Sequence, residues 1–562
     1  MGKLLVTVTI SVVSALIYFG MKIYASRREL WALQKAGLPM PDVHPVFGHL
    51  LVLKKASASL PPNTIMHNVM WKIARQSFPG GIYYLYLWPF SRTLLVVADA
   101  YAASQVETMS LGKGDNLVQP IEVITGGSSL FTMEGEEWKR WRRLFSTGFS
   151  AGYLVGLAPV IADEVAVFRD LLLQKCRQSS DGCSKVFQLE LKEMTVRMTF
   201  DVIGRVVLDT RLDYQMRDNE LAAALRSSIE WTTWRDQLNP ITKYLTIRPI
   251  VHWFNSRAMN RYIGKEIDQR FAEHIEAGSN NQTKASTNDS SPRSKSIVSL
   301  LIDELERETG SDTLDHIKRD VKVSMASQLR AFLFAGHDTS SAALTYCYYL
   351  LSTHPDALSR LLAEHNAIFG TDPTEARAEI HKDPHKVNQL PFTTAVIKET
   401  LRLFPPAGSM RLGRAGAFIT DESGRQFPTV NCNVWTLSLA IHHDPRYWHE
   451  PERFLPERWL ASPGDALYAG NTKGAWRPFE HGPRSCIGQT LALLELKIAL
   501  VLTVREVHVV PAYKEWDALH PKKSRNGAQL IKTVNGNRAY QEEKGAAHPA
   551  DGFPVIVELR KP

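Results

Sequence analysis

The most apolar stretch of the chain lies at its N-terminus. Residues 4–21 (LLVTVTISVVSALIYFGM) contain no charged side chain, and an α-helix of that length, rising about 1.5 Å per residue, nearly spans a hydrocarbon core of about 30 Å. A cleaved signal peptide usually has a shorter apolar core of about 7–15 residues, so the run favours an uncleaved anchor. Lys22, Arg27 and Arg28 follow it, whereas only Lys3 precedes it. The positive-inside rule therefore predicts a body on the cytosolic side.

The residues after this run predict a stiff connection to the body. Pro39, Pro41 and Pro45 lie close together, and proline fixes φ and removes a backbone donor, so an extended segment is expected. We find no later boundary that would divide the chain into several domains. Three regions are expected: an N-terminal membrane anchor over residues 1–24, a basic and proline-rich hinge over residues 25–50, and one folded domain over residues 51–562.

Helical patterns dominate the rest of the chain. Residues 315–353 contain no proline and one glycine, Gly336, which predicts a helix long enough to cross a domain. Short strand signals occur over residues 81–97 and at PVIVEL near the C-terminus. Residues 277–296 are rich in Ser, Asn and Thr and predict a surface loop, whose two sequons should stay unglycosylated on a cytosolic body. The expected fold is mainly α with small β-sheets in a single domain.

Composition narrows the class of protein. The chain has 562 residues, 44% hydrophobic and 22% charged, which is typical of a globular protein. Five scattered cysteines form no CxxC pair, so neither a secreted disulfide framework nor a structural zinc site is expected. The net charge is +8, but no basic stripe with interleaved aromatic residues accompanies it, so we expect no nucleic-acid binding. The excess suits a membrane surface or an acidic protein partner.

The most informative stretch is residues 479–488, FEHGPRSCIG. Its cysteine, Cys486, precedes the strongly helical run IGQTLALLELKIALVL, so the thiol is expected at a helix N-terminus, where the partial positive charge lowers a thiol pKa. Gly482 and Gly488 permit a tight loop. A thiolate bound to haem iron needs such a loop, because backbone N–H groups must point at the sulfur.

The remaining residues of this loop match one known family. Phe479 supplies apolar cover, and Arg484 supplies a cation that can reach a haem propionate. A lone cysteine is usually a small buried hydrophobe, and with His481 nearby a nucleophile or another metal site would also be open. However, the stretch matches FxxGxRxCxG at every fixed position, and the chain resembles the cytochrome P450 superfamily. The resemblance implies the cytochrome P450 fold and heme b, with Cys486 as the axial iron ligand and Phe479, Arg484 and Gly488 binding the cofactor.

A second motif is structural. Glu399 and Arg402 are three residues apart on a predicted helix and so share a face; alone, such a pair is most often a solvated surface pair. In the family this ExxR element joins a later arginine in a buried network, and Arg458 in PERW matches it. Trp459 stands where the family often has Phe. Removing one member of such a network would cost several kcal/mol.

The run Ala335-Gly336-His337-Asp338-Thr339-Ser340 interrupts the apolar pattern of the long helix. Polar groups there are costly unless used, although a threonine bonded to the carbonyl four residues earlier is common in helices. The run resembles the family's (A/G)GxDT motif for oxygen activation. The resemblance implies that the glycine lets the helix open locally, and that Thr339 and Asp338 handle protons as the catalytic residues.

Further cations are expected around the cofactor. Trp138 and Arg142 are four residues apart on a predicted helix and resemble the family's WxxxR element, in which both side chains reach a propionate. Arg411 follows Pro405-Pro406 and is a third candidate, with Arg414 as the alternative.

Two further groups have simpler expected roles. Lys139, Arg140 and Arg143 suggest a cationic face, which in the family docks an acidic flavin reductase. His442 and His443 are expected to be structural, since the thiolate already fills the axial position.

The resemblance implies a monooxygenase anchored in the endoplasmic reticulum membrane by one span, with a cytosolic catalytic domain. It would take electrons from an NADPH-cytochrome P450 reductase, with cytochrome b5 as a possible second donor, and insert one atom of O2 into a lipophilic small molecule by hydroxylation or epoxidation. The sequence is similar in style to filamentous-fungal enzymes of secondary metabolism, which suggests a terpenoid or polyketide.

Four mostly aliphatic or small-residue segments are expected to line the substrate site: residues 117–130, 331–335, 405–410 and the turn at 535–536. Two alternatives stay open: a haem-thiolate isomerase or dehydratase, which needs no reductase, and a non-catalytic haem-binding membrane protein. The Asp338-Thr339 pair argues against both.

Overall fold

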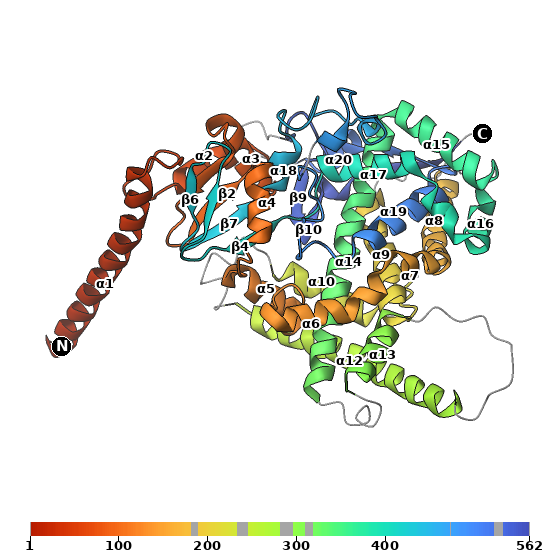
Figure 1. Cartoon of the computed structure of the whole chain (residues 1–562), viewed down its shortest axis with the longest axis horizontal. Coiled ribbons are helices and arrows are strands. Elements are labelled where there is room, and N and C mark those ends of the chain that lie inside the picture. Colours follow the sequence, from red (N-terminus) through yellow and green to blue (C-terminus); the bar gives the residue numbers. More distant parts are fainter. Residues whose placement is uncertain are drawn as a thin grey trace.

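Helices form most of this computed structural model, which describes residues 2–180, 189–232, 246–281, 296–309, 319–471, 474–521 and 532–560 (Figure 1). The α-helices are α1 Gly2–Lys35, α2 Leu50–Ala58, α3 Met66–Ser77, α4 Ala100–Thr108, α5 Asp115–Thr125, α6 Gly135–Ser146, α7 Ala151–Gly156, α8 Ala158–Ser180, α9 Leu191–Leu208, α10 Glu220–Glu230, α12 Arg248–Asn281, α13 Ile297–Thr309, α14 Arg319–Thr353, α15 Pro355–Phe369, α16 Ala376–Lys382, α17 Pro391–Leu403, α18 Ser438–His442, α19 Gln489–Thr503 and α20 Tyr513–Leu519.

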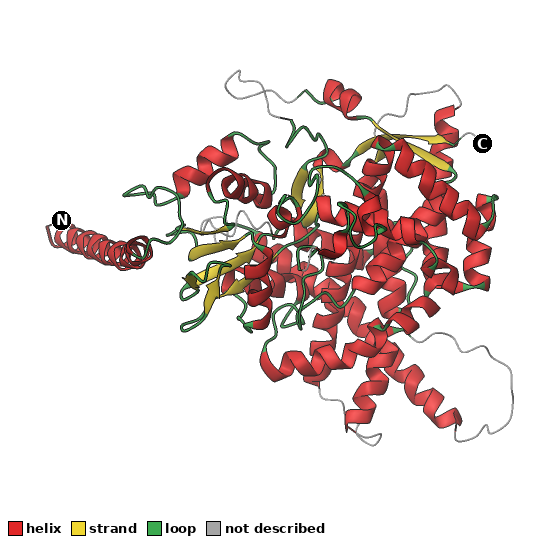
Figure 2. Cartoon of the chain, turned by 45° about the horizontal axis from the view of Figure 1, so that its top comes forward, coloured by secondary structure: helices red, strands yellow, loops and turns green. Residues whose placement is uncertain are grey.

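Small sheets complete the structure, as predicted, and Figure 2 shows their strands in short groups among the helices. The largest has the strand order β1-β2-β7-β4, with β2 and β7 parallel and the outer pairs antiparallel. The strands are β1 Ile82–Leu85, β2 Thr93–Val97, β3 Leu189–Glu190, β4 Ser409–Leu412, β5 Phe418–Thr420, β6 Gln426–Pro428, β7 Cys432–Thr436, β8 Val507–Pro511, β9 Gln541–Lys544, β10 Ala546–Pro549 and β11 Pro554–Leu559.

The long helix α14 crosses the middle of the molecule (Figure 1). It packs against α9, α12, α17, α19 and β10. The polar run at residues 335–340 does not end the helix, because α14 is helical without interruption from Arg319 to Thr353. Gly336 instead permits close packing, since a Cβ there would lie 2.7 Å from Ile203 Cδ1 on α9. Its role in the structure is to bring two helices together.

The N-terminal helix α1 is longer than its apolar run and projects from the body (Figure 1). Residues 9–35 are apolar enough to cross a membrane, with a mean hydropathy of 1.3 over the best window. Its last turns contact the body: Leu30 is buried, and Arg27 donates to the Val46 carbonyl at 2.8 Å and lies over the Tyr86 ring. The expected hinge therefore begins as helix, and its irregular part starts after Lys35.

The loop predicted over residues 277–296 falls mostly outside the described residues. Helix α12 includes its first five positions and ends at Asn281, the first sequon. Residues 282–295, which hold the second sequon, lie outside the described ranges.

Candidate functional site

The Cys486 loop closes directly before α19. The Cys486 amide donates to the Phe479 carbonyl at 2.8 Å, and Gly488 is the N-cap residue of the helix. The backbone N–H groups of Gly488 and Gln489 are hydrogen-bonded to the thiol. A Cβ on Gly488 would lie 3.8 Å from the sulfur, so this glycine sits against it. The loop therefore supplies the N–H donors that a thiolate ligand requires.

Cys486 differs from the other cysteines that the structure describes. Cys176, Cys347 and Cys432 are buried, whereas Cys486 is exposed. Burial nevertheless raises the pKa of the Cys486 thiol, against the opposing effects of the Gly488 amide and of Arg142. Both observations hold if the thiol lies in a recess that protein atoms surround and solvent still reaches. The expectation of a lowered thiol pKa is thus wrong, because desolvation of the thiol outweighs the effect of the helix terminus.

Cations gather around this thiol. Arg142 on α6 is close enough to Cys486 for each charge to affect the other. Burial lowers the pKa of Arg484 to about 10, with Arg411 acting in the same direction. Burial also lowers the pKa of Lys113 to about 7, helped by Arg411 and Arg484. These four cations include Lys113, which the sequence analysis did not single out. Glu134 and Glu480 lie close enough to these cations to offset part of their charge. The remaining excess of positive charge is unfavourable unless a further anion occupies the same space.

One of these cations has an unsatisfied donor. Arg411 lies on β4 and is 9% exposed, and its Nη1 has no hydrogen-bond partner among the described residues. Arg414 does not belong to this charge cluster as far as the described interactions go, and its amide donates to Thr429. The geometry therefore favours Arg411 over Arg414 as a ligand for an anionic group. A buried orphan donor is rare and calls for a partner.

Trp138 and Arg484 connect helix α6 to the Cys486 loop. The Arg484 guanidinium lies 3.9 Å from the centroid of the Trp138 ring, and its Nη1 donates to the Met133 carbonyl at 2.9 Å. Arg142 follows Trp138 by one helical turn. The thiol is accessible, has two backbone donors and lies near Arg142. A cluster formed by Lys113, Arg411 and Arg484, the last of them on the same loop as the thiol, has one unsatisfied donor on Arg411. This arrangement fits a haem with its iron at the sulfur and its two propionates among the cations.

The pair Asp338-Thr339 lies on α14. The Thr339 hydroxyl donates to the Ala335 carbonyl at 2.7 Å, within its own helix. Asp338 is buried and faces the hairpin of β9 and β10: its Oδ1 accepts from His548 Nε2 at 2.7 Å, and its Oδ2 accepts from the Ala546 amide. The structure thus shows Asp338 joined to a buried histidine that sequence analysis missed.

The electrostatics of this pair favour an ionised aspartate. Burial opposes ionisation of Asp338, but the electrostatic interaction and the hydrogen bond with His548 outweigh it and hold the pKa of Asp338 below its usual value. Burial lowers the pKa of His548 to about 4. At neutral pH the aspartate is therefore charged and the imidazole neutral.

The structure brings the three members of the predicted network together. Glu399 is fully buried and accepts from Arg402 Nη2 at 2.8 Å and from Arg458 Nε at 2.9 Å. Trp459 adds a donor, because its indole Nε1 lies 3.1 Å from the other oxygen of Glu399. Burial opposes ionisation, but Arg402 and Arg458 keep the pKa of Glu399 below its usual value.

His442 and His443 belong to the packing around this network. His442 Nδ1 is bonded to the Arg402 carbonyl at 2.9 Å, and its Nε2 accepts from the Arg477 amide. His443 Nδ1 is bonded to the Leu439 carbonyl. Both imidazoles have backbone partners, which agrees with the structural role expected for them.

The cationic face expected on α6 is partly neutralised. Arg140 and Arg143 both pair with Glu308 on α13, at 2.9 and 2.7 Å, and Lys139 pairs with Glu136. Lys139 and Arg143 remain 64% and 73% exposed at their side chains, so both stay accessible to a partner.

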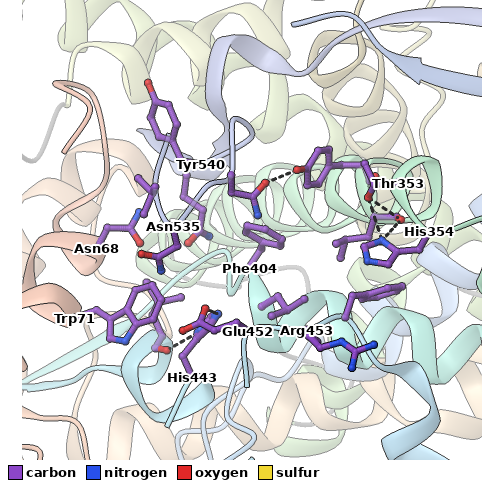
Figure 3. Close-up of a pocket in the computed structure, with 18 residues that line it drawn as sticks. Asn68, Trp71, Thr353, His354, Phe404, His443, Glu452, Arg453, Asn535 and Tyr540 are labelled. Carbon is purple, nitrogen blue, oxygen red and sulfur yellow. Dashed lines mark hydrogen bonds and ion pairs between the residues drawn. The ribbon is translucent and has the colours of Figure 1, made fainter. Parts of the chain in front are cut away.

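A separate cavity of about 320 Å³ shares no lining residue with the Cys486 site. Figure 3 shows Trp71, His443 and Asn535 around it. The turn predicted at residues 535–536 exists, since Val534 and Asn537 exchange backbone hydrogen bonds, but it lines this cavity. The turn that lies against Asp338 of α14 is the one at Gly545, between β9 and β10.

Comparisons with known proteins agree with this geometry. The family model described as Cytochrome P450 matches residues 38–532. The chain is 35% identical to Cytochrome P450 monooxygenase polC of Polytolypa hystricis over 566 residues, covering 100% of this chain and 96% of that protein. It is 29% identical to Cytochrome P450 monooxygenase acrF of Aspergillus aculeatus, covering 86% and 95%. It is also 29% identical to human Cytochrome P450 3A7, covering 71% and 72%.

Proposed function

Because this chain belongs to the cytochrome P450 family, we propose that it inserts one atom of O2 into a lipophilic secondary metabolite at the cytosolic face of the endoplasmic reticulum. That it is a haem-dependent monooxygenase follows from the family and from its relatives, which are named monooxygenases. When bound, haem with a thiolate ligand supplies the reductive activation of O2. The observation that carries the proposal is the accessible Cys486 thiol beneath the amides of Gly488 and Gln489.

The residues around the thiol have distinct tasks. Cys486 would hold the iron, and its two N–H donors would temper the charge on the sulfur. Lys113, Arg142, Arg411 and Arg484 would neutralise the propionates, which relieves the repulsion among these cations. Trp138 would keep the Arg484 guanidinium in place by stacking.

Proton handling is assigned to α14. Thr339 carries a hydroxyl that can exchange its intrahelical bond to Ala335 for one to the reacting oxygen, at little cost, because the backbone carbonyl keeps its helical partner. Asp338 holds its charge in a buried site and is the nearest group along the chain that can accept and return a proton.

The proposed substrate is a terpenoid or polyketide. Support comes from the apolar character of the predicted lining segments and from two relatives of fungal origin. Phe334 on α14 lies in one of these segments, and its ring centroid is 6.2 Å from that of Phe131. Rings on that face suit a substrate with extended hydrocarbon surface and few charges.

The proposed partners are an NADPH-cytochrome P450 reductase and a membrane. Lys139 and Arg143 remain exposed on α6, where an acidic flavoprotein surface could approach. The exposed apolar side chains of α1, from Val6 to Tyr24, suit a single membrane span.

The test is the absorbance spectrum of the reduced, CO-bound protein, with wild type beside Cys486→His and the neighbouring control Ser485→Ala. We expect the strongly red-shifted Soret band of a thiolate-bound haem in the wild type and the control, and its loss in Cys486→His. A histidine-like spectrum in the wild type would overturn the ligand assignment.

A second measurement separates the monooxygenase from the two alternatives. Extracts of candidate lipophilic substrates are incubated with and without NADPH and reductase, under air and under nitrogen. Product that forms only with NADPH, reductase and O2 supports the proposal. Product without them indicates an isomerase or dehydratase, and a protein that binds haem but is not reduced indicates a non-catalytic role.

A further inference from the structure

The β9–β10 hairpin covers Asp338. Ala546 and His548 are two residues apart on β10, so their positions face the same side of the strand, and both bond to the Asp338 carboxylate. Gly545 at the turn has φ +89°, and a Cβ there would clash with Asp338 Oδ2. The chain thus places a glycine, an amide and an imidazole, all from one hairpin, against one carboxylate of α14.

His548 is bonded on only one side. Its Nε2 lies 2.7 Å from Asp338 Oδ1, and its Nδ1 is buried without a hydrogen-bond partner among the described residues. An ionised carboxylate only accepts hydrogen bonds, so Nε2 carries the hydrogen and Nδ1 of the neutral ring carries a bare lone pair. Buried nitrogens of this kind are normally satisfied. Nδ1 is therefore the one ring atom of His548 at which a proton can add.

We propose that His548 is a positioning residue of the proton-delivery path, which takes up a proton at Nδ1 and passes one to Asp338 from Nε2. This inference rests on the proposed function, because Asp338 has a proton to deliver only in an oxygen-activating enzyme. In the transfer, a proton binds Nδ1 and the Nε2–H bond breaks as an O–H bond forms at Oδ1. The imidazole ends neutral, the carboxyl ends protonated, and no electron moves.

Other titratable groups lie near this pair. Lys192, half-buried at the start of α9, acts electrostatically on both Asp338 and His548. His337 acts on both from the same helix as Asp338. Glu542 is the cross-strand neighbour of His548 on β9 and is itself bonded to the Tyr540 hydroxyl.

The contacts of the Asp338 carboxylate explain why the imidazole of His548 is needed. The amide of Ala546 and the turn at Gly545 shield the second oxygen of Asp338, so His548 is the titratable group bonded to the carboxylate among the described residues. A neutral imidazole with one bare nitrogen can move a proton between its two sides, which an amide or hydroxyl in that place does less readily.

The experiment compares full-length His548→Gln with wild type, using an NADPH-dependent reductase and a substrate found by the incubations above. Glutamine keeps an N–H donor toward Asp338 but titrates nowhere near neutral pH. The matched control is His365→Gln, since His365 is equally buried and bonded to Thr393. Product per NADPH, hydrogen peroxide released and the solvent isotope effect in D2O are measured, together with Asp338→Asn and the double variant.

We expect His548→Gln to retain the red-shifted CO band and to lose about tenfold in product per NADPH, with peroxide rising in return, because positioned acid–base groups contribute about 10²–10⁴-fold. The isotope effect should increase, and adding His548→Gln to Asp338→Asn should change nothing further. Should the glutamine variant fail to bind haem, the smaller His548→Asn provides the same comparison.

A readout independent of turnover is the thermal midpoint of the substrate-free ferric protein against pH. Because the pKa of His548 is about 4 in the folded protein and 6.5 in the unfolded chain, the wild type loses stability as the pH falls through that window. His548→Gln should lack this contribution to the acid sensitivity. His548→Gln matching His365→Gln in coupling, peroxide and isotope effect overturns the inference. If instead wild type itself forms no NADPH-dependent product, the proposed function fails, which is a distinct result.

Discussion

The Arg484 guanidinium stacks 3.9 Å above the centroid of the Trp138 ring, which joins the Cys486 loop to helix α6. Without this ring, Arg484 would keep its bond to the Met133 carbonyl and its attraction to Glu134 but would be freer to leave the propionate position. We expect Trp138→Leu to weaken haem retention by about tenfold, since a partly desolvated cation–π contact contributes about 1–2 kcal/mol. Haem content per protein after gel filtration measures this.

The control for this change is Lys139→Leu, one residue later on the same helix and exposed. It alters charge and size on α6 without touching Arg484. Equal haem content in the two variants would show that the Trp138 ring does not hold the cation.

The amino-acid sequence predicted those parts of the site whose residues lie close together along the chain. The Cys486 loop and the start of α19 could be read within one stretch of chain, because loop closure and helix capping are local. The pairing of Asp338 with His548 could not, because the two are 210 residues apart and no local pattern marks His548 as a partner. Lys113 was missed for the same reason: only the fold brings it to Arg411 and Arg484.

Packing also gives Gly336 and Trp459 roles that differ from those expected from the sequence. Gly336 was expected to let α14 open, but the close approach of Ile203 gives it a packing role that the sequence of α14 alone cannot reveal. Trp459 looked like a departure from a family pattern, yet its indole N–H reaches Glu399.

Trp459 is therefore expected to stabilise the fold in a way that phenylalanine cannot. Trp459→Phe removes one donor from the fully buried Glu399 and leaves the two arginines in place. Hydrogen bonds to charged groups contribute about 1.5–3 kcal/mol, and part of this is recovered because the other donors remain. We expect the free energy of unfolding to fall by about 1–2 kcal/mol, measured by urea denaturation followed at the CO band.

Glu457→Gln is the matched control, since Glu457 is two residues away and its pairing with Arg360 is exposed. Exposed pairs contribute about 0–1 kcal/mol. A loss for Trp459→Phe no larger than that of Glu457→Gln would mean that the indole bond adds nothing.

The last turns of α1 are expected to belong to the folded body. Deleting residues 2–24 leaves Arg27 with its bond to Val46 and its stacking on Tyr86, and leaves Leu30 buried. This variant should fold and show the same CO band as the full chain. Deleting residues 2–35 removes those contacts and uncovers Tyr86. The free energy of unfolding should then fall by about 2–3 kcal/mol, because the burial of Leu30 is lost.

The two deletions control for each other, because both remove the apolar segment and differ only in the contact residues. The measurement compares the thermal midpoints of the two truncated proteins in the same detergent. Equal midpoints would show that α1 contacts the body without stabilising it.

The connection after α1 is also expected to be acid-sensitive, through His49. This imidazole is fully buried between the hinge and the sheet: its Nε2 is bonded to the Pro41 carbonyl at 2.9 Å, and its Nδ1 accepts from the Tyr86 amide at 2.8 Å. Because Nδ1 must accept, the ring is neutral in the folded protein. Burial lowers the pKa of His49 to about 4 from 6.5, against the opposing effect of the Pro41 carbonyl.

The sign of the pH dependence follows from proton binding. Between pH 6.5 and about 4 the unfolded chain protonates His49 and the folded chain does not, so stability falls as the pH drops through that window, by about 3 kcal/mol in total. Above pH 6.5 the protonation of His49 makes stability no more dependent on pH.

Other buried histidines act in the same direction, so the measurement is the difference in unfolding free energy between wild type and His49→Gln at pH 7.5 and pH 4.5. We expect the variant to be less stable at the higher pH and to lose less on acidification, because glutamine can replace the bond to Tyr86 only in part and binds no proton. Parallel pH curves for the two proteins would place the acid sensitivity elsewhere.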